Sequence, residues 1–114
     1  MNDSELISDL RRLPHFRALP PDLVEAIAAG SKRVTCKAGQ TIFSEGEAVR
    51  AFYCVRRGAV KVYRLSPDGR EQVLHHLGEA HTFAEAAVLS MPRYPAHAVA
   101  VEAGTELIEI GAER

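Results

Sequence analysis

Any metal or haem site in this chain would have to be built from its histidines. Five are present: His15, His75, His76, His81 and His97. No CxxCH sequence occurs, which excludes covalently attached haem. His75 and His76 are adjacent in a strand-like run, so their side chains should point to opposite faces and only one can face an interior. No metal site is predicted.

The surroundings of the histidines favour packing over ligation. His75 should share one face with Val73 and Leu77, and His97 alternates with Val99 and Val101. A hydrogen-bonded core histidine is the more frequent outcome in such apolar surroundings. If haem binds without covalent attachment, His75 and His15 are the candidate ligands, although His15 directly follows Pro14 and is expected at the surface.

Enzyme chemistry finds little support. A metal-dependent cupin site needs two histidines spaced His-x-His on one strand face with a downstream glutamate, whereas this chain has His-His. The serines lie in turn-like surroundings without a nucleophile elbow. We therefore expect a protein that is not an enzyme.

Composition indicates which cellular compartment and which class of binding partner to expect. The 114 residues suit one domain, and the net charge of -1, from 14 basic and 15 acidic residues, offers no general attraction to nucleic acid. The acidic N-terminus is unlike a signal peptide, and no run approaches the ~20 apolar residues of a membrane span. Cys36 and Cys54 belong to no CxxC pair. We expect a soluble cytoplasmic protein with both cysteines as small core residues.

Two short helices should open the chain. In residues 4–13, apolar residues recur at helical spacing until Pro14, and a second amphipathic stretch runs from Pro21 to Gly30. From Arg33 to Ile110 the pattern changes to at least seven short β-type runs separated by glycines. We expect N-terminal helices over residues 1–31 and a closed or sandwiched antiparallel β domain over residues 32–110.

Two local features stand out within the β region. The stretch "SPDG", from Ser66 to Gly69, predicts a turn that joins the strands "AVKVYRL" and "REQVLHHL" into a hairpin. The segment from Thr82 to Leu89 interrupts the strand rhythm with residues that favour helix, so a short internal helix is predicted there.

The order of motifs is similar to one known family. "AGQTIFSEGE", "AFYCVRRGAVKVYRLSPDGRE", "HLGEAHTFAEAAVL" and "YPAHAVA" occur in sequence over most of the chain. This order resembles the sensor domain of the Crp/Fnr superfamily of bacterial transcription regulators. The resemblance implies a mainly β double-stranded β-helix, the jelly roll of cyclic-nucleotide-binding domains, with two N-terminal helices and one internal helix.

The resemblance also implies a ligand site around the internal helix. In nucleotide-binding relatives, N–H groups at the helix N-terminus and an arginine hold the cyclic phosphate, while a glutamate accepts from the ribose. Glu85 matches the glutamate, but Ala84 replaces the family's glycine, and Tyr94 or Pro95 occupies the arginine position, with Arg93 one or two residues early. The candidate ligand-binding residues are Ala84, Glu85, Ala86, Ala87, Arg93, Tyr94, Ala96 and His97.

These departures leave several outcomes open. The chain could bind a cyclic nucleotide, another small effector or haem, since the Tyr-Pro form resembles the redox- and gas-sensing branch of the superfamily. Alternatively, the pocket is vestigial, the small residues let a helix pack tightly, and the domain serves as an interaction module. An iron-sulfur cluster of the family's founding type is excluded, because residues 1–35 contain no cysteine.

Full regulators of this kind continue into a dimerisation helix and a helix-turn-helix domain. This chain stops at Arg114, and none of its segments resembles a recognition helix. DNA binding is therefore expected only through a C-terminal domain outside these residues, in a parent protein that forms a homodimer.

Overall fold

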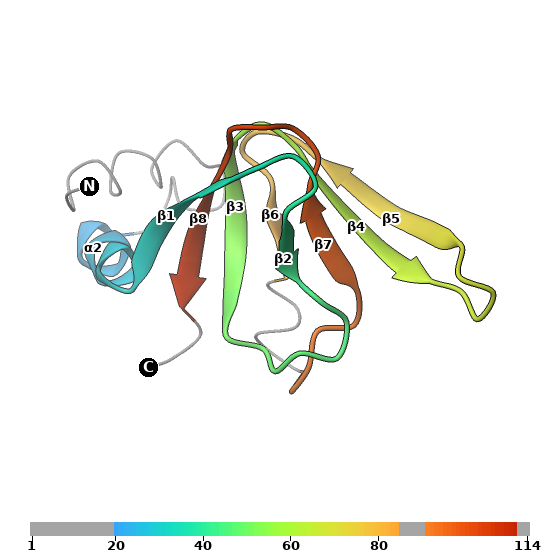
Figure 1. The fold of residues 1–114 in the computed structure, drawn as a ribbon. Helices are drawn as coiled ribbons and strands as arrows, with labels where there is room; N and C mark the ends of the chain where they lie inside the picture. The colour runs from blue at the N-terminus through green and yellow to red at the C-terminus, as the bar shows by residue number, and fades with distance from the viewer. Residues whose placement is uncertain (1–19, 85–90, 112–114) are drawn as a thin grey trace.

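The computed structural model describes residues 20–84 and 91–111, and within them the chain forms one helix and eight strands. The strands make two four-stranded antiparallel sheets, ordered β1-β8-β3-β6 and β2-β7-β4-β5 (Figure 1). Their bounds are α2 Pro21–Ala29, β1 Ser31–Cys36, β2 Thr41–Phe43, β3 Ala51–Arg57, β4 Val60–Leu65, β5 Glu71–Leu77, β6 Thr82–Phe83, β7 His97–Ala100 and β8 Thr105–Gly111. The mainly β jelly roll expected from the sequence is confirmed.

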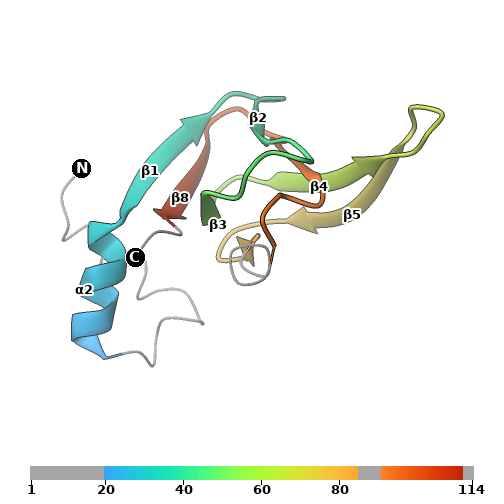
Figure 2. The ribbon, with the colours of Figure 1, turned by 90° about the horizontal axis from the view of Figure 1, so that it is seen from below.

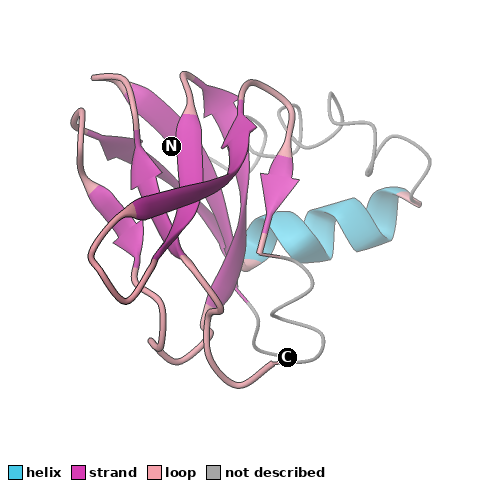
Figure 3. Ribbon diagram, turned by 90° about the vertical axis from the view of Figure 1, so that its right-hand side faces the viewer, coloured by secondary structure: helices cyan, strands magenta, loops and turns pink. Residues whose placement is uncertain are grey.

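The helix α2 begins where the sequence predicts it. Pro21 occupies the first turn, where its missing N–H costs nothing, and the Gly30 N–H caps the other end on the Ile27 carbonyl at 3.1 Å. Val24 and Ala28 are buried against β3 and β8, so α2 covers the outer face of the first sheet (Figure 3). No helix in the described ranges has the length and apolarity that crossing a membrane requires. The helix expected over residues 4–13 lies outside the described residues.

The core lies between the two sheets. Alternate residues of β3 and β8, such as Tyr53 and Leu107, meet Val60 of β4 and Ala98 of β7. Because α2 covers the opposite face, β8 is buried on both sides, and its adjacent residues Leu107 and Ile108 pack into the core between the sheets and against α2 respectively. Cys36 is buried between the sheets and Cys54 under α2, as small core residues, as expected, and burial raises the pKa of the Cys36 thiol.

The sequence predicts an internal helix that begins at Thr82, but no helix begins there. Thr82 and Phe83 instead form the short edge strand β6, paired with Cys54 and Tyr53 of β3. The Phe83 ring stacks on Tyr53 with centroids 5.2 Å apart. Burial of this ring outweighs the few tenths of a kcal/mol by which helix propensities differ. Residues 85–90 of the predicted helix lie outside the described residues.

The hairpin predicted across "SPDG" is confirmed and carries a bulge. It joins β4 to β5 and extends away from β1, β8 and β3 (Figures 1 and 2). Val62 pairs with His75 but Tyr63 pairs with Val73, which leaves Leu74 as an extra residue on β5. A bulge changes the alternation of faces. The expected common face of Val73, His75 and Leu77 is therefore wrong for Val73.

The fold should be sensitive to any side chain placed at Gly58. Its φ is +92°, and a Cβ placed there would lie 2.8 Å from Thr105 Cα, a backbone atom that cannot turn aside. Gly58→Ala should lower the free energy of unfolding by about 2–4 kcal/mol in urea denaturation. Gly69→Ala is the matched control, because its φ is +86° but nothing lies within 4 Å. It should cost about 1 kcal/mol, and equal losses in the two variants would contradict the steric argument.

Candidate functional site

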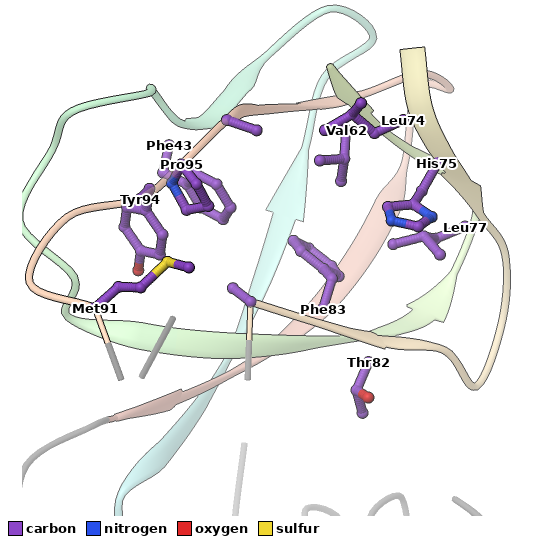
Figure 4. A pocket seen from close by; sticks show the side chains of 12 residues that line it. Phe43, Val62, Leu74, His75, Leu77, Thr82, Phe83, Met91, Tyr94 and Pro95 are labelled. Atoms are coloured by element: carbon purple, nitrogen blue, oxygen red, sulfur yellow. The ribbon is translucent and has the colours of Figure 1, made fainter. Parts of the chain in front are cut away.

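A cavity of about 330 Å³ opens beside the second sheet. Its walls come from β2, β4, β5 and β6 and from the residues on either side of 85–90 (Figure 4). The lining residues are Phe43, Val62, Leu74, His75, Leu77, Thr82, Phe83, Ala84, Met91, Tyr94, Pro95 and Ala96. The volume lies at the lower end of the range for small-molecule sites, which are mostly apolar with few polar groups.

Tyr94 anchors one end of this cavity. Its ring lies flat on Phe43, with centroids 3.8 Å apart and an interplanar angle of 9°. Its hydroxyl donates to the Ala51 carbonyl at 2.7 Å and accepts the N–H groups of Ala51 at 3.2 Å and Arg50 at 3.3 Å. Its backbone exchanges hydrogen bonds of 2.9 Å with Gly46 and Glu47. The ring is therefore a wall of the cavity, while the hydroxyl is occupied by protein.

Arg93 points away from the cavity. Its Nη1 donates to the Gly46 carbonyl at 2.8 Å, and the residue forms an isolated bridge with Ala48. The side chain is exposed and does not line the cavity. In this arrangement the guanidinium that would hold a phosphate serves to fasten the 91–96 segment to the loop after β2.

Ala84 occupies a backbone conformation that suits glycine. Its φ is +72°, in the left-handed region where a Cβ costs roughly 1–2 kcal/mol. The glycine of the family pattern is thus explained by backbone geometry at this position. In this chain the alanine methyl takes that place on the cavity wall.

His75 is the one histidine on the cavity wall among the described residues, and it is exposed, so the expected core setting is wrong for it. It follows the bulge residue Leu74, and the bulge allows both neighbours to contribute to the wall. Its imidazole lies near Leu77 in Figure 4. Nowhere in the described ranges do three His, Cys, Asp or Glu side chains gather as a metal site.

His97 lies outside the cavity. Ala96, Ala98 and Ala100 are buried, so His97 takes the other face of β7, where its ring stacks on Tyr63 with centroids 5.0 Å apart. Its Nδ1 accepts the Glu45 N–H at 3.2 Å. The expected apolar core setting is wrong for His97, because the inward register belongs to the alanines.

The described walls offer few charged or unbonded polar groups. No Lys, Arg, Asp or Glu is among the described lining residues. The Tyr94 hydroxyl is bonded to Ala51, and the Thr82 hydroxyl points away from the Phe83 ring in Figure 4. The cavity therefore presents aromatic and aliphatic surface with an imidazole at the β5 side.

The candidate residues are divided by this geometry. Ala84, Tyr94 and Ala96 line the cavity together, whereas Arg93 and His97 do not. Glu85, Ala86, Ala87 and His15 lie outside the described residues. Most of the wall, including Phe43, Val62, Leu77 and Phe83, was not predicted as a site from the sequence. Their signal was the inward-facing half of the strand alternation, which marks core positions without separating cavity from packed core.

Comparison with known proteins agrees with this architecture. The family described as "Cyclic nucleotide-binding domain" matches residues 33–114. The chain belongs to this family, within the Crp/Fnr superfamily. The domain is 33% identical over 79 residues to the "CRP-like cAMP-activated global transcriptional regulator" of Mycobacterium tuberculosis, a match that covers 69% of this chain and 35% of that relative. The chain thus spans about a third of this curated relative.

Solved structures of the same superfamily superpose closely on the domain. The sensor domain of the transcriptional regulator DNR from Pseudomonas aeruginosa gives a TM-score of 0.88 at 33% identity, over 96% of this chain and 73% of that one. The catabolite activator protein of Thermus thermophilus gives 0.75 at 33% identity, over 87% and 46% of the two chains. The relatives are transcription regulators.

Two tyrosines provide a test of the Tyr94 anchor. Tyr94→Phe leaves the Ala51 carbonyl without its donor, so it should lower the free energy of unfolding by about 1–3 kcal/mol. The Tyr53 hydroxyl is buried without a hydrogen-bond partner among the described residues, and burial, with Glu109 and Tyr94 nearby, raises its pKa. Tyr53→Phe should therefore be neutral or stabilising in urea denaturation. A cost at Tyr53 equal to that at Tyr94 would argue against the anchor.

Two alanines test the strain at the cavity wall. Ala84→Gly should raise the free energy of unfolding by about 0.5–1 kcal/mol, because glycine removes the left-handed penalty and loses part of the gain to unfolded-state entropy. Ala80→Gly, at φ +71° and away from the wall, should give a similar gain. Thermal unfolding measures both, and destabilisation by Ala84→Gly alone would show that its methyl packs favourably in the cavity.

Proposed function

We propose that this domain senses a small effector for a Crp/Fnr-type transcription regulator and is not an enzyme. The single observation that supports this most strongly is the cavity, whose walls combine Phe83 of one sheet with Val62 and Leu77 of the other. An effector in this cavity contacts both sheets and the 91–96 segment at once. Such a ligand shifts the balance between conformations by its differential affinity for them.

The effect on DNA belongs to a longer protein. The curated relative is named as cAMP-activated and as a global transcriptional regulator, and this chain spans about a third of it. We propose that effector binding biases a C-terminal DNA-binding domain outside these residues, in a homodimeric cytoplasmic parent protein. The alternative function is an interaction module with a vestigial pocket.

The effector could also be haem, and His75 is the observation that favours this candidate. Its imidazole lines a cavity with aromatic walls, and a histidine imidazole is a common protein ligand of haem. Haem bound there would supply a site for gas binding or electron transfer at its iron. His75 would hold the group, and Phe43 and Phe83 would limit its access to water.

Direct binding measurements test the proposal. The chain is titrated with cyclic AMP and cyclic GMP by calorimetry, with haem by an absorption scan for a Soret band, and with a panel of small apolar and polar molecules by thermal unfolding. A ligand at about 100 times its Kd should raise the free energy of unfolding by about 2.7 kcal/mol.

A cavity-filling variant links any binding to the site. Ala96 is buried on the wall, so Ala96→Leu should fill part of the space and abolish binding, whereas Ala26→Leu on the exposed side of α2 should leave it unchanged. Binding that survives Ala96→Leu places the ligand elsewhere. No binding in any arm supports the vestigial pocket.

A further inference from the structure

We propose that the cavity selects an uncharged, mainly apolar effector with an aromatic ring and one hydrogen-bonding group, and does not select an anion such as a cyclic nucleotide. This inference rests on the proposed function, because it names the chemical class of effector for the same cavity. Three independent features carry it: the composition of the walls, the engagement of the nearby basic side chains, and the position of His75.

Three aromatic rings dominate the walls. Phe43 lies between Tyr94 and Phe83, with ring centroids 3.8 Å and 6.2 Å away respectively. Aliphatic side chains of β4 and β5 complete the surface. A flat apolar molecule gains from leaving water against such walls. The described lining residues supply no opposite charge, so they would not compensate a phosphate for the hydration that it loses.

Basic side chains on β4, on the 91–96 segment and on the loop after β2 already have protein acceptors. These pairs are Arg93 with the Gly46 carbonyl at 2.8 Å, Arg64 with the Pro95 carbonyl at 2.8 Å, Arg50 with the Ile42 carbonyl at 3.2 Å, and Lys61 with the Glu71 carboxylate at 2.7 Å. A phosphate could recruit a cation only by breaking such a contact. These four cations are therefore engaged with protein acceptors in this structure.

Among the described side chains of the wall, His75 is the polar group that can meet an effector. The hydroxyls of Tyr94 and Thr82 are bonded elsewhere or turned away, whereas the His75 ring lies on the wall. An imidazole offers one donor and one acceptor when neutral. An effector that is apolar along most of its length and carries one N–H or O–H group matches this arrangement.

The test uses the uncharged dye N-phenyl-1-naphthylamine, which has two aromatic systems and one N–H group. Its fluorescence should rise on binding to the 114-residue chain. Leu74 lines the cavity and is 47% exposed, while Leu65 lies on the same hairpin, outside the wall, and is 50% exposed. Leu74→Asp should weaken dye binding at least about tenfold, because a carboxylate then lies on the wall. Leu65→Asp should change it less than twofold, and equal weakening would overturn the inference by assigning the dye to the hairpin surface.

A histidine pair tests the polar contact. His75→Ala should weaken dye binding about fivefold through loss of one hydrogen bond. His76→Ala, on the neighbouring residue outside the wall, should leave the affinity unchanged. An unchanged affinity in His75→Ala would overturn the assignment of the polar contact, provided that both variants unfold at the temperature of the parent chain.

Competition separates this inference from the proposed function. Cyclic AMP should not displace the dye. If cyclic AMP displaces it and Arg93→Ala prevents the displacement, the apolar class is wrong while the sensing function stands. If neither the dye nor any ligand of the panel binds, both the inference and the sensing function fail.

Discussion

The hydroxyl of Tyr94 holds the site together. It satisfies the Ala51 carbonyl and N–H at the start of β3, in the first sheet, while its ring lies on Phe43 of β2, in the second. One buried side chain thus links the two sheets at the end of the cavity. A hydrogen bond to a buried backbone group is worth more for what its loss would leave unsatisfied than for its own net energy. The register of the 91–96 segment follows from this anchor.

Arg93 precedes Tyr94 and faces the other way. While the Tyr94 ring lies on the cavity wall, the Arg93 guanidinium meets the Gly46 carbonyl outside it. Moving the guanidinium to the cavity would break its hydrogen bond to the Gly46 carbonyl, a contact that fastens the segment carrying Tyr94. The chemistry of the site and the packing of the sheets are therefore determined by the same pair of residues.

Elements with a local sequence pattern could be predicted, whereas features that depend on the pairing between strands could not. The helix from Pro21, the runs that became β1 to β5, β7 and β8, and the "SPDG" hairpin could be found because proline, glycine and alternation act over a few residues. The bulge at Leu74 could not, since it depends on which residue of β4 each partner meets. Phe83 was assigned to a helix because the gain from stacking on Tyr53 is invisible in the sequence.

The site itself was only partly within reach of the sequence. The 94–96 segment was located by its resemblance to a family pattern, but the wall residues of β2, β4 and β5 look like any core positions. They differ from packed core positions because part of each side chain faces the cavity, and the packing of the two sheets decides this.

The apolar walls also bear on selectivity. Each roughly 100 Å² of apolar surface that an effector buries contributes about 2.5 kcal/mol, enough to shift a two-state balance by about 70-fold if only one state offers the walls. Shape and apolar contact alone can therefore supply the free energy that sensing requires, without a charge pair from Arg93.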